Sequence, residues 1–241
     1  MERASRHPVT IWTASTGQAL GLTSAACLDE EELRKAYLFK QPDDRDRFLA
    51  ARALLRHALS ELMDGEIDPE TWNYIEGANG KPLMAPDLPL LEFNMSHAGD
   101  CVVVAVSPSG PVGVDVESTL RDERLEIVDD VLTGQERAHL ARLPDDRQWK
   151  AFVEFWTLKE ACAKALGLGA TLDFGKLEVL LKPLRVVAPQ GLLGPGETFD
   201  IETQEVFLYE KPYRLSTAHI TVEPGETEFR FKSLPDDHIV T

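Results

Sequence analysis

Two carboxylate residues, Asp115 and Glu117, stand two positions apart in a segment with strand-like alternation. Valines occupy positions 112, 114 and 116, so the two carboxylates share the opposite face of a predicted β-strand. Adjacent carboxylates repel each other unless a cation lies between them. Mg²⁺ suits such oxygen ligands, because it usually takes one or two carboxylates together with substrate phosphates and water. The segment is therefore either part of a magnesium site or an exposed edge strand with acidic residues facing solvent.

A second chemically capable group lies in residues 155–166, where apolar residues recur every three or four positions and predict a helix. Trp156, Glu160 and Lys164 are four residues apart and share another face of this helix, with Lys159 beside them. Two interpretations are open. Glu160 is a base or a metal ligand and Lys164 is a cation for phosphate chemistry, or the two form a supportive ion pair on an amphipathic surface helix.

Periodicity and turn residues predict the elements that must position these side chains. We expect strands at 9–12, 67–74, 91–95, 101–107, 113–117 and 177–181, an antiparallel pair at 201–209 and 213–220, and helices at 30–39, 43–62, 125–131, 135–143 and 149–166. Residues from Pro224 onward are expected to form a ragged tail. On the helix 43–62, Arg45 and Arg52 are interpreted as a solvated face paired with nearby aspartates.

Four motifs follow one another along the chain: Gly80-Lys81-Pro82, Phe93-Asn94-Met95-Ser96-His97, Gly113-Val114-Asp115-Val116-Glu117 and Trp156-Thr157-Leu158-Lys159-Glu160-Ala161-Cys162-Ala163-Lys164. Their order and spacing resemble the 4'-phosphopantetheinyl transferases, specifically the long, surfactin-synthetase-activating (Sfp-like) class, over roughly positions 30 to 180. The resemblance implies an α+β fold of two similar halves related by a pseudo-twofold axis, with the active site in the cleft between them. The halves would be 1–118, with the coenzyme A-binding segments and metal strand, and 119–241, with the catalytic helix 149–166.

The resemblance implies a transferase that moves the 4'-phosphopantetheine arm of coenzyme A onto a serine of an acyl or peptidyl carrier protein and releases 3',5'-ADP. It implies Mg²⁺ on the pyrophosphate, held by Asp115, Glu117 and Glu160. Either Glu160 itself or a metal-bound water that it orients would be the base, Lys164 would stabilise the leaving group, and Lys159 would be a second cation.

Coenzyme A binding is also implied by the resemblance. Arg47 resembles the residue that contacts the 3'-phosphate, and a Gly-Lys-Pro loop lies against the adenine nucleotide in this family. The residues so implied are Arg47, Arg56, Lys81, Pro82, Ser96, His97, Lys159 and Lys164. Glu136 is either an additional acidic residue near the metal or an ordinary first-turn helix glutamate.

Composition excludes several function classes. With 43% hydrophobic residues, the 241-residue chain can bury a sizeable core, and its net charge of −16 argues against nucleic-acid binding. Anionic partners such as coenzyme A and carrier proteins would then depend on local basic clusters, because exposed charges act over about 8 Å at cellular salt. Three scattered cysteines argue against a disulfide framework or zinc site. Without a signal-peptide or membrane-spanning pattern, we expect a cytoplasmic monomer.

Two alternatives to the transferase remain open. One is a magnesium-dependent phosphohydrolase, which would use the same carboxylates with water as the nucleophile and would need no carrier protein. The other is a non-catalytic nucleotide-binding protein on the same fold.

Overall fold

The strand β5, Cys101–Ser107, is a run of seven buried residues and shows how the layers form. This computed structural model describes residues 7–22, 28–77, 80–120, 127–208 and 210–234. The even-numbered valines of β5 pack with helix α3 (Pro42–Leu62). The odd-numbered residues pack with a second sheet. Because side chains alternate along a strand, a strand covered on both faces is apolar throughout.

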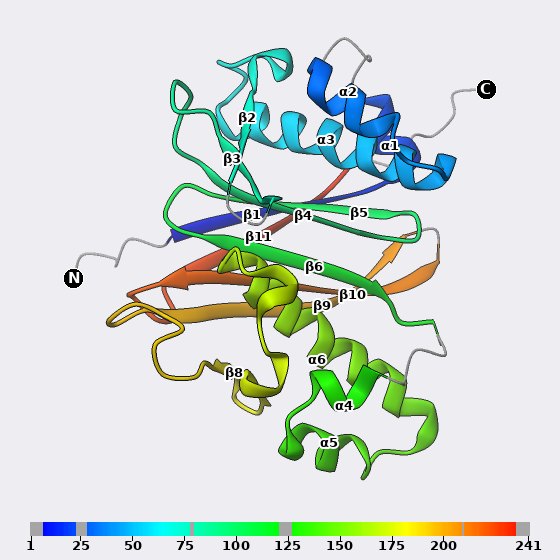
Figure 1. Cartoon of the computed structure of the whole chain (residues 1–241), viewed down its shortest axis with the longest axis vertical. Coiled ribbons are helices and arrows are strands. Elements are labelled where there is room, and N and C mark those ends of the chain that lie inside the picture. The colour runs from blue at the N-terminus through cyan, green and yellow to red at the C-terminus, as the bar shows by residue number, and fades with distance from the viewer. Residues whose placement is uncertain (1–6, 23–27, 78–79, 121–126, 209, 235–241) are drawn as a thin grey trace.

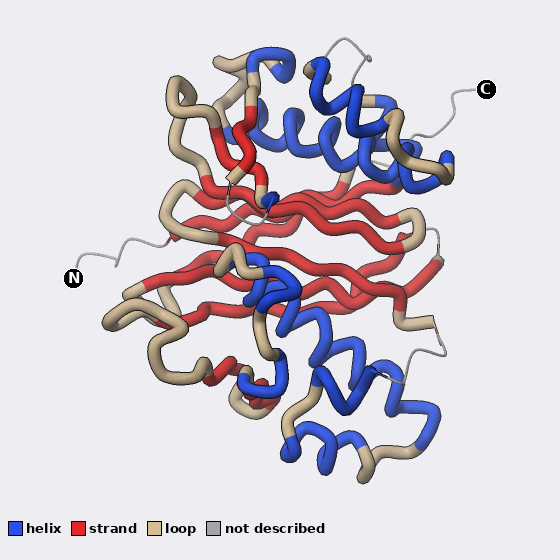
Figure 2. Tube along the Cα trace, in the orientation of Figure 1, coloured by secondary structure: helices blue, strands red, loops and turns tan. Residues whose placement is uncertain are grey.

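The described chain stacks in four layers, helix, sheet, sheet and helix, as Figure 1 and Figure 2 show. The first sheet has the order β11-β1-β5-β4 and the second has the order β6-β10-β9. The strands of the first sheet are β1 (His7–Ser15), β4 (Glu92–Ala98), β5 and β11 (Thr227–Ser233), and those of the second are β6 (Val112–Ser118), β9 (Thr198–Leu208) and β10 (Lys211–Thr221). The β1–β11 pair is parallel, and the other pairs in these sheets are antiparallel.

One long helix covers each sheet. Helix α3 packs on the first sheet, and α6 (Asp145–Ala165) packs on the second. The smaller elements are α1 (Thr16–Gly21), α2 (Glu30–Ala36), α4 (Val128–Val131), α5 (Gly134–Leu140), the 3-10 turns η2 (Pro69–Thr71), η5 (Gly169–Thr171) and η6 (Phe174–Lys176), and the two-stranded sheets β2 (Tyr74–Glu76) with β3 (Pro82–Met84) and β7 (Glu178–Leu181) with β8 (Leu184–Val187). No helix in these described ranges is long and apolar enough to cross a bilayer.

The two sheets meet at their edge strands β4 and β6. The Oδ1 atom of Asn94 on β4 accepts a hydrogen bond of 3.0 Å from the backbone amide of Val114 on β6. The valines of β6 pack between the sheets, so the opposite face of β6, with Asp115 and Glu117, is directed away from this core. The alternation seen in the sequence therefore places both carboxylates as predicted.

The mixed α+β class is confirmed, and most predicted elements are present, including the β9–β10 pair. Two predictions are wrong. Residues 227–233 form β11 on the edge of β1 where a ragged tail was expected, and residues 67–74 form mainly η2 and coil where a strand was expected. The first residues of the helix predicted at 125–131 lie outside the described ranges, as does Cys27.

The division into 1–118 and 119–241 stays a prediction, as does the pseudo-twofold axis. The sheets themselves cross that boundary: β6 pairs with β10, and β11 pairs with β1.

Candidate active site

A pocket of about 420 Å³ opens between α3 and α6, where β4 and β6 meet. Its lining residues are Phe48, Ala51, Arg52, Met95, Ser96, His97, Asp115, Glu117, Trp156, Glu160 and Lys164. The structure thus brings together six of the predicted site residues, from β4, β6 and α6.

Gly113 allows this arrangement, because helix α6 crosses β6 with no room for a side chain. A Cβ atom at position 113 would collide with the carbonyl oxygen of Ala161 and the amide nitrogen of Ala165, and would lie 3.0 Å from the carbonyl carbon of Lys164. Each of these is a backbone atom of α6, which cannot rotate aside. The glycine therefore sets how closely Glu160 and Lys164 approach Asp115.

Three polar side chains from three elements join at this crossing. The Nζ atom of Lys164 donates to Asp115 Oδ1 at 2.5 Å and to Ser96 Oγ at 3.1 Å. Ser96 Oγ in turn donates to the same Asp115 oxygen at 2.8 Å. Asp115 is only 4% exposed, so little water screens its charge. Its attraction to the Lys164 ammonium is therefore stronger than it would be in bulk water.

Burial and neighbouring charges perturb the acid–base groups of the pocket. Burial raises the pKa of the Glu160 carboxyl, the Asp115 charge raises it further, and Lys164 opposes both. Burial lowers the pKa of His97, and the positive charges of Arg47 and Lys164 lower it further. A carboxylate with a raised pKa is a better proton acceptor near neutral pH, whereas His97 is biased toward its neutral form.

One oxygen atom of Asp115 is placed so that it could bind a divalent cation. The Oδ2 atom of Asp115 is buried and has no hydrogen-bond partner among the described residues. A buried carboxylate oxygen without a partner is unfavourable, and a cation would satisfy it. No group of three or more His, Cys, Asp and Glu side chains in the described ranges is already arranged around a metal position. Mg²⁺ does not require such a group, because substrate phosphates and water complete its octahedron.

The predicted nucleotide-binding residues lie at two sides of this pocket. Arg47 on α3 is paired with Asp44 at 2.5 Å and donates to the carbonyl oxygen of Gly99 at 3.4 Å, near His97. Lys81 and Pro82 line an adjoining pocket of about 210 Å³ that shares Met95 and Lys164 with the first. The Nζ atom of Lys81 donates to the backbone carbonyl of Lys164 at 3.2 Å, at the end of α6.

Arg56 is not brought to the pocket, which corrects the sequence prediction. Its side chain is 1% exposed and donates to Glu32 Oε2 at 2.5 Å and to the carbonyl oxygen of Trp72. Arg56 lies nine residues from Arg47 and therefore on another side of α3. It ties α3 to α2 and to the segment after η2.

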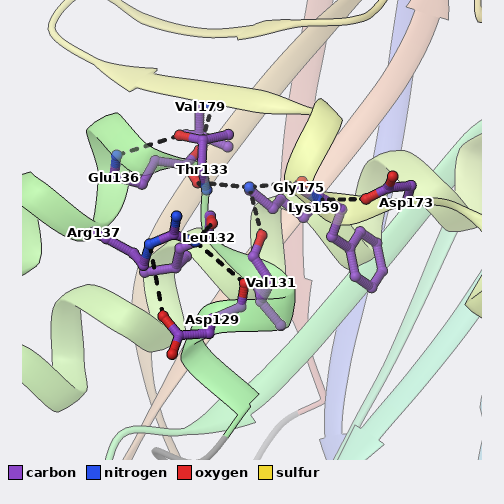
Figure 3. Close-up of polar contacts among 11 residues, drawn as sticks. Asp129, Val131, Leu132, Thr133, Glu136, Arg137, Lys159, Asp173, Gly175 and Val179 are labelled. Atoms are coloured by element: carbon purple, nitrogen blue, oxygen red, sulfur yellow. Dashed lines mark hydrogen bonds and ion pairs between the residues drawn. The ribbon is translucent and has the colours of Figure 1, made fainter.

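Lys159 and Glu136 are likewise directed away from the pocket, although Lys159 adjoins Glu160 in the sequence. Figure 3 shows Lys159 among residues of α4, α5 and η6. Its Nζ atom is fully buried and donates to Glu136 Oε2 at 2.6 Å, to the carbonyl of Val131 at 2.8 Å and to that of Phe174 at 2.9 Å. All three ammonium protons are used, so Lys159 holds these elements on α6. Glu136 therefore pairs with Lys159 and not with a metal ion.

The sequence interpretation missed Arg52, which lines the pocket although it was assigned to a solvated face. Its side chain is 13% exposed, and its guanidinium carbon lies 5.4 Å from the centroid of the Phe48 ring. Arg52 follows Phe48 by four residues and so shares its face of the helix. This four-residue spacing was the feature of the sequence that could have placed Arg52 on the same helix face as Phe48.

Comparisons with known proteins match both parts of the chain. The family described as "4'-phosphopantetheinyl transferase superfamily" matches residues 111–218, and "4'-phosphopantetheinyl transferase, N-terminal" matches residues 10–109. A putative 4'-phosphopantetheinyl transferase of Synechocystis sp. is 30% identical over 190 residues, which cover 78% of this chain and 75% of the relative. The 4'-phosphopantetheinyl transferase HetI of Nostoc sp. is 32% identical over 163 residues, 66% of this chain and 67% of the relative.

Among solved structures, a holo-(acyl-carrier-protein) synthase from Bacillus anthracis, in complex with CoA (3',5'-ADP), is 17% identical, with a TM-score of 0.37. It covers 46% of this chain and 94% of its own.

Proposed function

Because this chain belongs to the 4'-phosphopantetheinyl transferase superfamily, we propose that it transfers the 4'-phosphopantetheine arm of coenzyme A onto a serine of an acyl or peptidyl carrier protein and releases 3',5'-ADP. The observation that carries this proposal is the contact of Lys164 with Ser96 and Asp115 in one pocket, beside Glu160. These groups can bind phosphate, hold a proton and meet developing negative charge.

In this reaction the serine oxygen of the carrier protein attacks the β-phosphorus of coenzyme A. A new P–O bond forms to the serine, the bridging P–O bond breaks, and 3',5'-ADP leaves. Glu160 accepts the serine proton, a role that suits a carboxylate whose pKa is raised by burial. The ammonium of Lys164 neutralises charge that develops on the phosphate oxygens.

Ser96 and His97 hold the phosphates at the end of β4, and the neutral form favoured at His97 donates one hydrogen bond. Arg47 binds the 3'-phosphate, and Lys81 with Pro82 contacts the nucleotide from the adjoining pocket. Asp115, Glu117 and Glu160 would hold the Mg²⁺ that we include in the proposal. When bound, Mg²⁺ supplies charge neutralisation on the pyrophosphate.

We assign the chain to the long, Sfp-like class within the superfamily. The support is that separate family matches cover residues 10–109 and 111–218, so both parts of the chain resemble transferase sequence. We further propose that it acts in the cytoplasm, as a monomer, on a protein partner and not on nucleic acid.

The release of 3',5'-ADP tests the proposal against the phosphohydrolase alternative. The protein is incubated with coenzyme A and Mg²⁺, with an apo carrier protein, with the same carrier carrying alanine at its acceptor serine, or with neither. We expect 3',5'-ADP by chromatography only with the intact apo carrier. Equal release of 3',5'-ADP in all three reactions would establish hydrolysis. No release in any of them would favour the non-catalytic nucleotide-binding protein.

A further inference from the structure

Helix α6 covers the second sheet (Figure 1), and most of the side chains that it buries are apolar. Apolar contacts are non-directional, so they favour burial without selecting one position of the helix along the strands. The proposed chemistry nevertheless requires Glu160 and Lys164 of α6 to meet Asp115 of β6 in one pocket. A directional contact between α6 and the sheet is therefore needed to fix the position of the helix.

A buried hydroxyl pair supplies such a contact. The Oγ1 atom of Thr157 on α6 lies 2.8 Å from Oγ of Ser216 on β10, and Ser216 is also hydrogen-bonded to Thr203 on β9 at 2.9 Å. Thr157 and Ser216 are both fully buried. Thr157 Oγ1 also lies 2.9 Å from the carbonyl oxygen of Val153, a contact that restricts the rotamer of a helical threonine. Because hydroxyl groups both donate and accept, one chain of hydrogen bonds joins α6 to β10 and β9.

This hydroxyl pair lies in the same row of the sheet as the Asp115 carboxylate. Ser216 is directly opposite Asp115 in the antiparallel β10–β6 register, and directly opposed residues share one face of a sheet. In the next row on that face, Arg214 is opposite Glu117, and its Nη1 atom lies 3.7 Å from Glu154 on α6. These two polar contacts between α6 and β10 thus fall in the rows that hold the two carboxylates of β6.

Thr157 is placed to pass its position on to the reacting groups. Glu160 and Lys164 follow it by three and seven residues, so they share its side of the helix within about 10 Å along the axis. Gly113 sets how closely α6 approaches β6, because a Cβ atom there would meet the helix backbone. The contact between Thr157 and Ser216 instead restricts movement of α6 along the strands.

Burial alone does not explain a hydroxyl pair at this place. Valine and alanine have shapes close to those of threonine and serine, and replacing both partners of a buried hydrogen bond by apolar groups is nearly neutral or stabilising. Thr217, the next residue on β10, is also fully buried, and its hydroxyl has no hydrogen-bond partner in the described ranges. The same strand therefore carries one buried hydroxyl that is bonded to α6 and one that is not.

We propose that Thr157 is a positioning residue for the transfer reaction. Its hydrogen bond with Ser216 holds α6 at one place along the second sheet. At that place Glu160 and Lys164 meet Asp115, so Thr157 acts through them and needs no contact with the substrate. The inference rests on the proposed function for the reaction that this placement serves.

The double variant Thr157→Val with Ser216→Ala separates positioning from stability. We expect its urea-unfolding free energy to stay close to that of the wild type, because both hydroxyls are removed together. The kcat for carrier modification should fall by about ten- to a hundredfold, because Glu160 and Lys164 lose their fixed distance to Asp115. The dissociation constant for coenzyme A, measured by calorimetry without carrier, should change little, since most of the residues assigned to coenzyme A lie outside α6.

Two matched variants complete the test. Thr217→Val makes the same substitution at the neighbouring buried position and should leave kcat unchanged, because that hydroxyl bonds to nothing within the described part of the chain. Thr157→Ser keeps the hydroxyl and should retain most of the wild-type kcat. Thr157→Val alone replaces the double variant should the latter fold poorly, and all rates are divided by the folded fraction from thermal unfolding.

The outcomes separate the inference from the proposed function. Wild-type kcat in the folded double variant would overturn the inference and leave the hydroxyl pair as ordinary core packing. A loss of kcat in Thr157→Ser or Thr217→Val as large as that in the double variant would also overturn it. A wild type that modifies no carrier would instead overturn the proposed function, and the inference with it.

Discussion

Replacing Gly113 with alanine is expected to separate the two walls of the active site. The new methyl group would overlap the carbonyl oxygen of Ala161 and the amide nitrogen of Ala165. Carbon needs about 3.5 Å from other heavy atoms, so α6 must move away from β6 by roughly 1 Å or more. Neither side can yield locally, since the clash involves the backbone on both elements.

Two consequences of this shift have estimable sizes. Inserting a methyl group into a close-packed contact costs roughly 1–3 kcal/mol of unfolding free energy. The displacement also lengthens the 2.5 Å contact between Lys164 Nζ and Asp115 Oδ1. A misplacement of about 1 Å in a catalytic group costs on the order of 100-fold in rate. We therefore expect kcat to fall by about that factor, with a smaller change in affinity for coenzyme A.

The assay compares kcat for carrier modification and the urea-unfolding free energy of Gly113→Ala with those of Gly134→Ala. Gly134 begins α5, and a Cβ atom there would meet nothing within 4 Å. The control should keep full activity, with a stability equal to or slightly above that of the wild type, because alanine favours helix. A Gly113→Ala variant with wild-type kcat and stability would refute the packing argument and the geometry of the site built on it.

Four further predictions concern single side chains. Asp115→Asn should lower kcat by about 100- to 1,000-fold, as should excess EDTA for the wild type, and full activity in either case would remove the metal role. Arg47→Ala should raise KM for coenzyme A while changing KM for 3'-dephospho-coenzyme A much less, and equal changes would remove the 3'-phosphate assignment. The folded protein holds the Glu160 proton to a higher pH than the unfolded chain, so the native carboxyl destabilises the fold as pH rises above about 4.5. Without metal, Glu160→Gln should thus be more stable than the wild type at pH 7 and lose this advantage at pH 4, and a pH-independent difference in urea unfolding would contradict the burial argument. Lys159→Met should lower the unfolding free energy by about 3–5 kcal/mol, measured by thermal and urea unfolding, because the Glu136 carboxylate is left buried without its cation. Adding Glu136→Leu should reverse only part of this loss, because the backbone amides of Thr133 and Val179 then lose the carboxylate that accepts their hydrogen bonds.

The parts of the site predicted from sequence are those set by local periodicity. Alternation fixed the facing of Asp115 and Glu117 on β6, and four-residue spacing placed Glu160 and Lys164 on one face of α6. Their meeting required the resemblance to a family, because local patterns do not say which strand a helix crosses.

The sequence predictions that differ from the structure concern residues whose positions depend on tertiary contacts. Lys159 and Glu160 are adjacent in sequence, so a helix turns them by about 100° from each other, and only the position of α4 and α5 decides that Lys159 is buried. Likewise, β11 is a strand because the edge of β1 is available to it, some 220 residues earlier in the chain. The stretch 227–233 alternates in a way that fits a strand, yet nothing local indicates its partner.

The intact mass of a carrier protein tests the central claim most directly. An apo carrier is incubated with coenzyme A, Mg²⁺ and either the wild type or Lys164→Ala, with folding of the variant checked by thermal unfolding. We predict that the wild type adds the mass of one phosphopantetheine group to the carrier, at its serine, and that folded Lys164→Ala adds it far more slowly. An unchanged carrier mass with the wild type, or equal rates for the two proteins, would contradict the account.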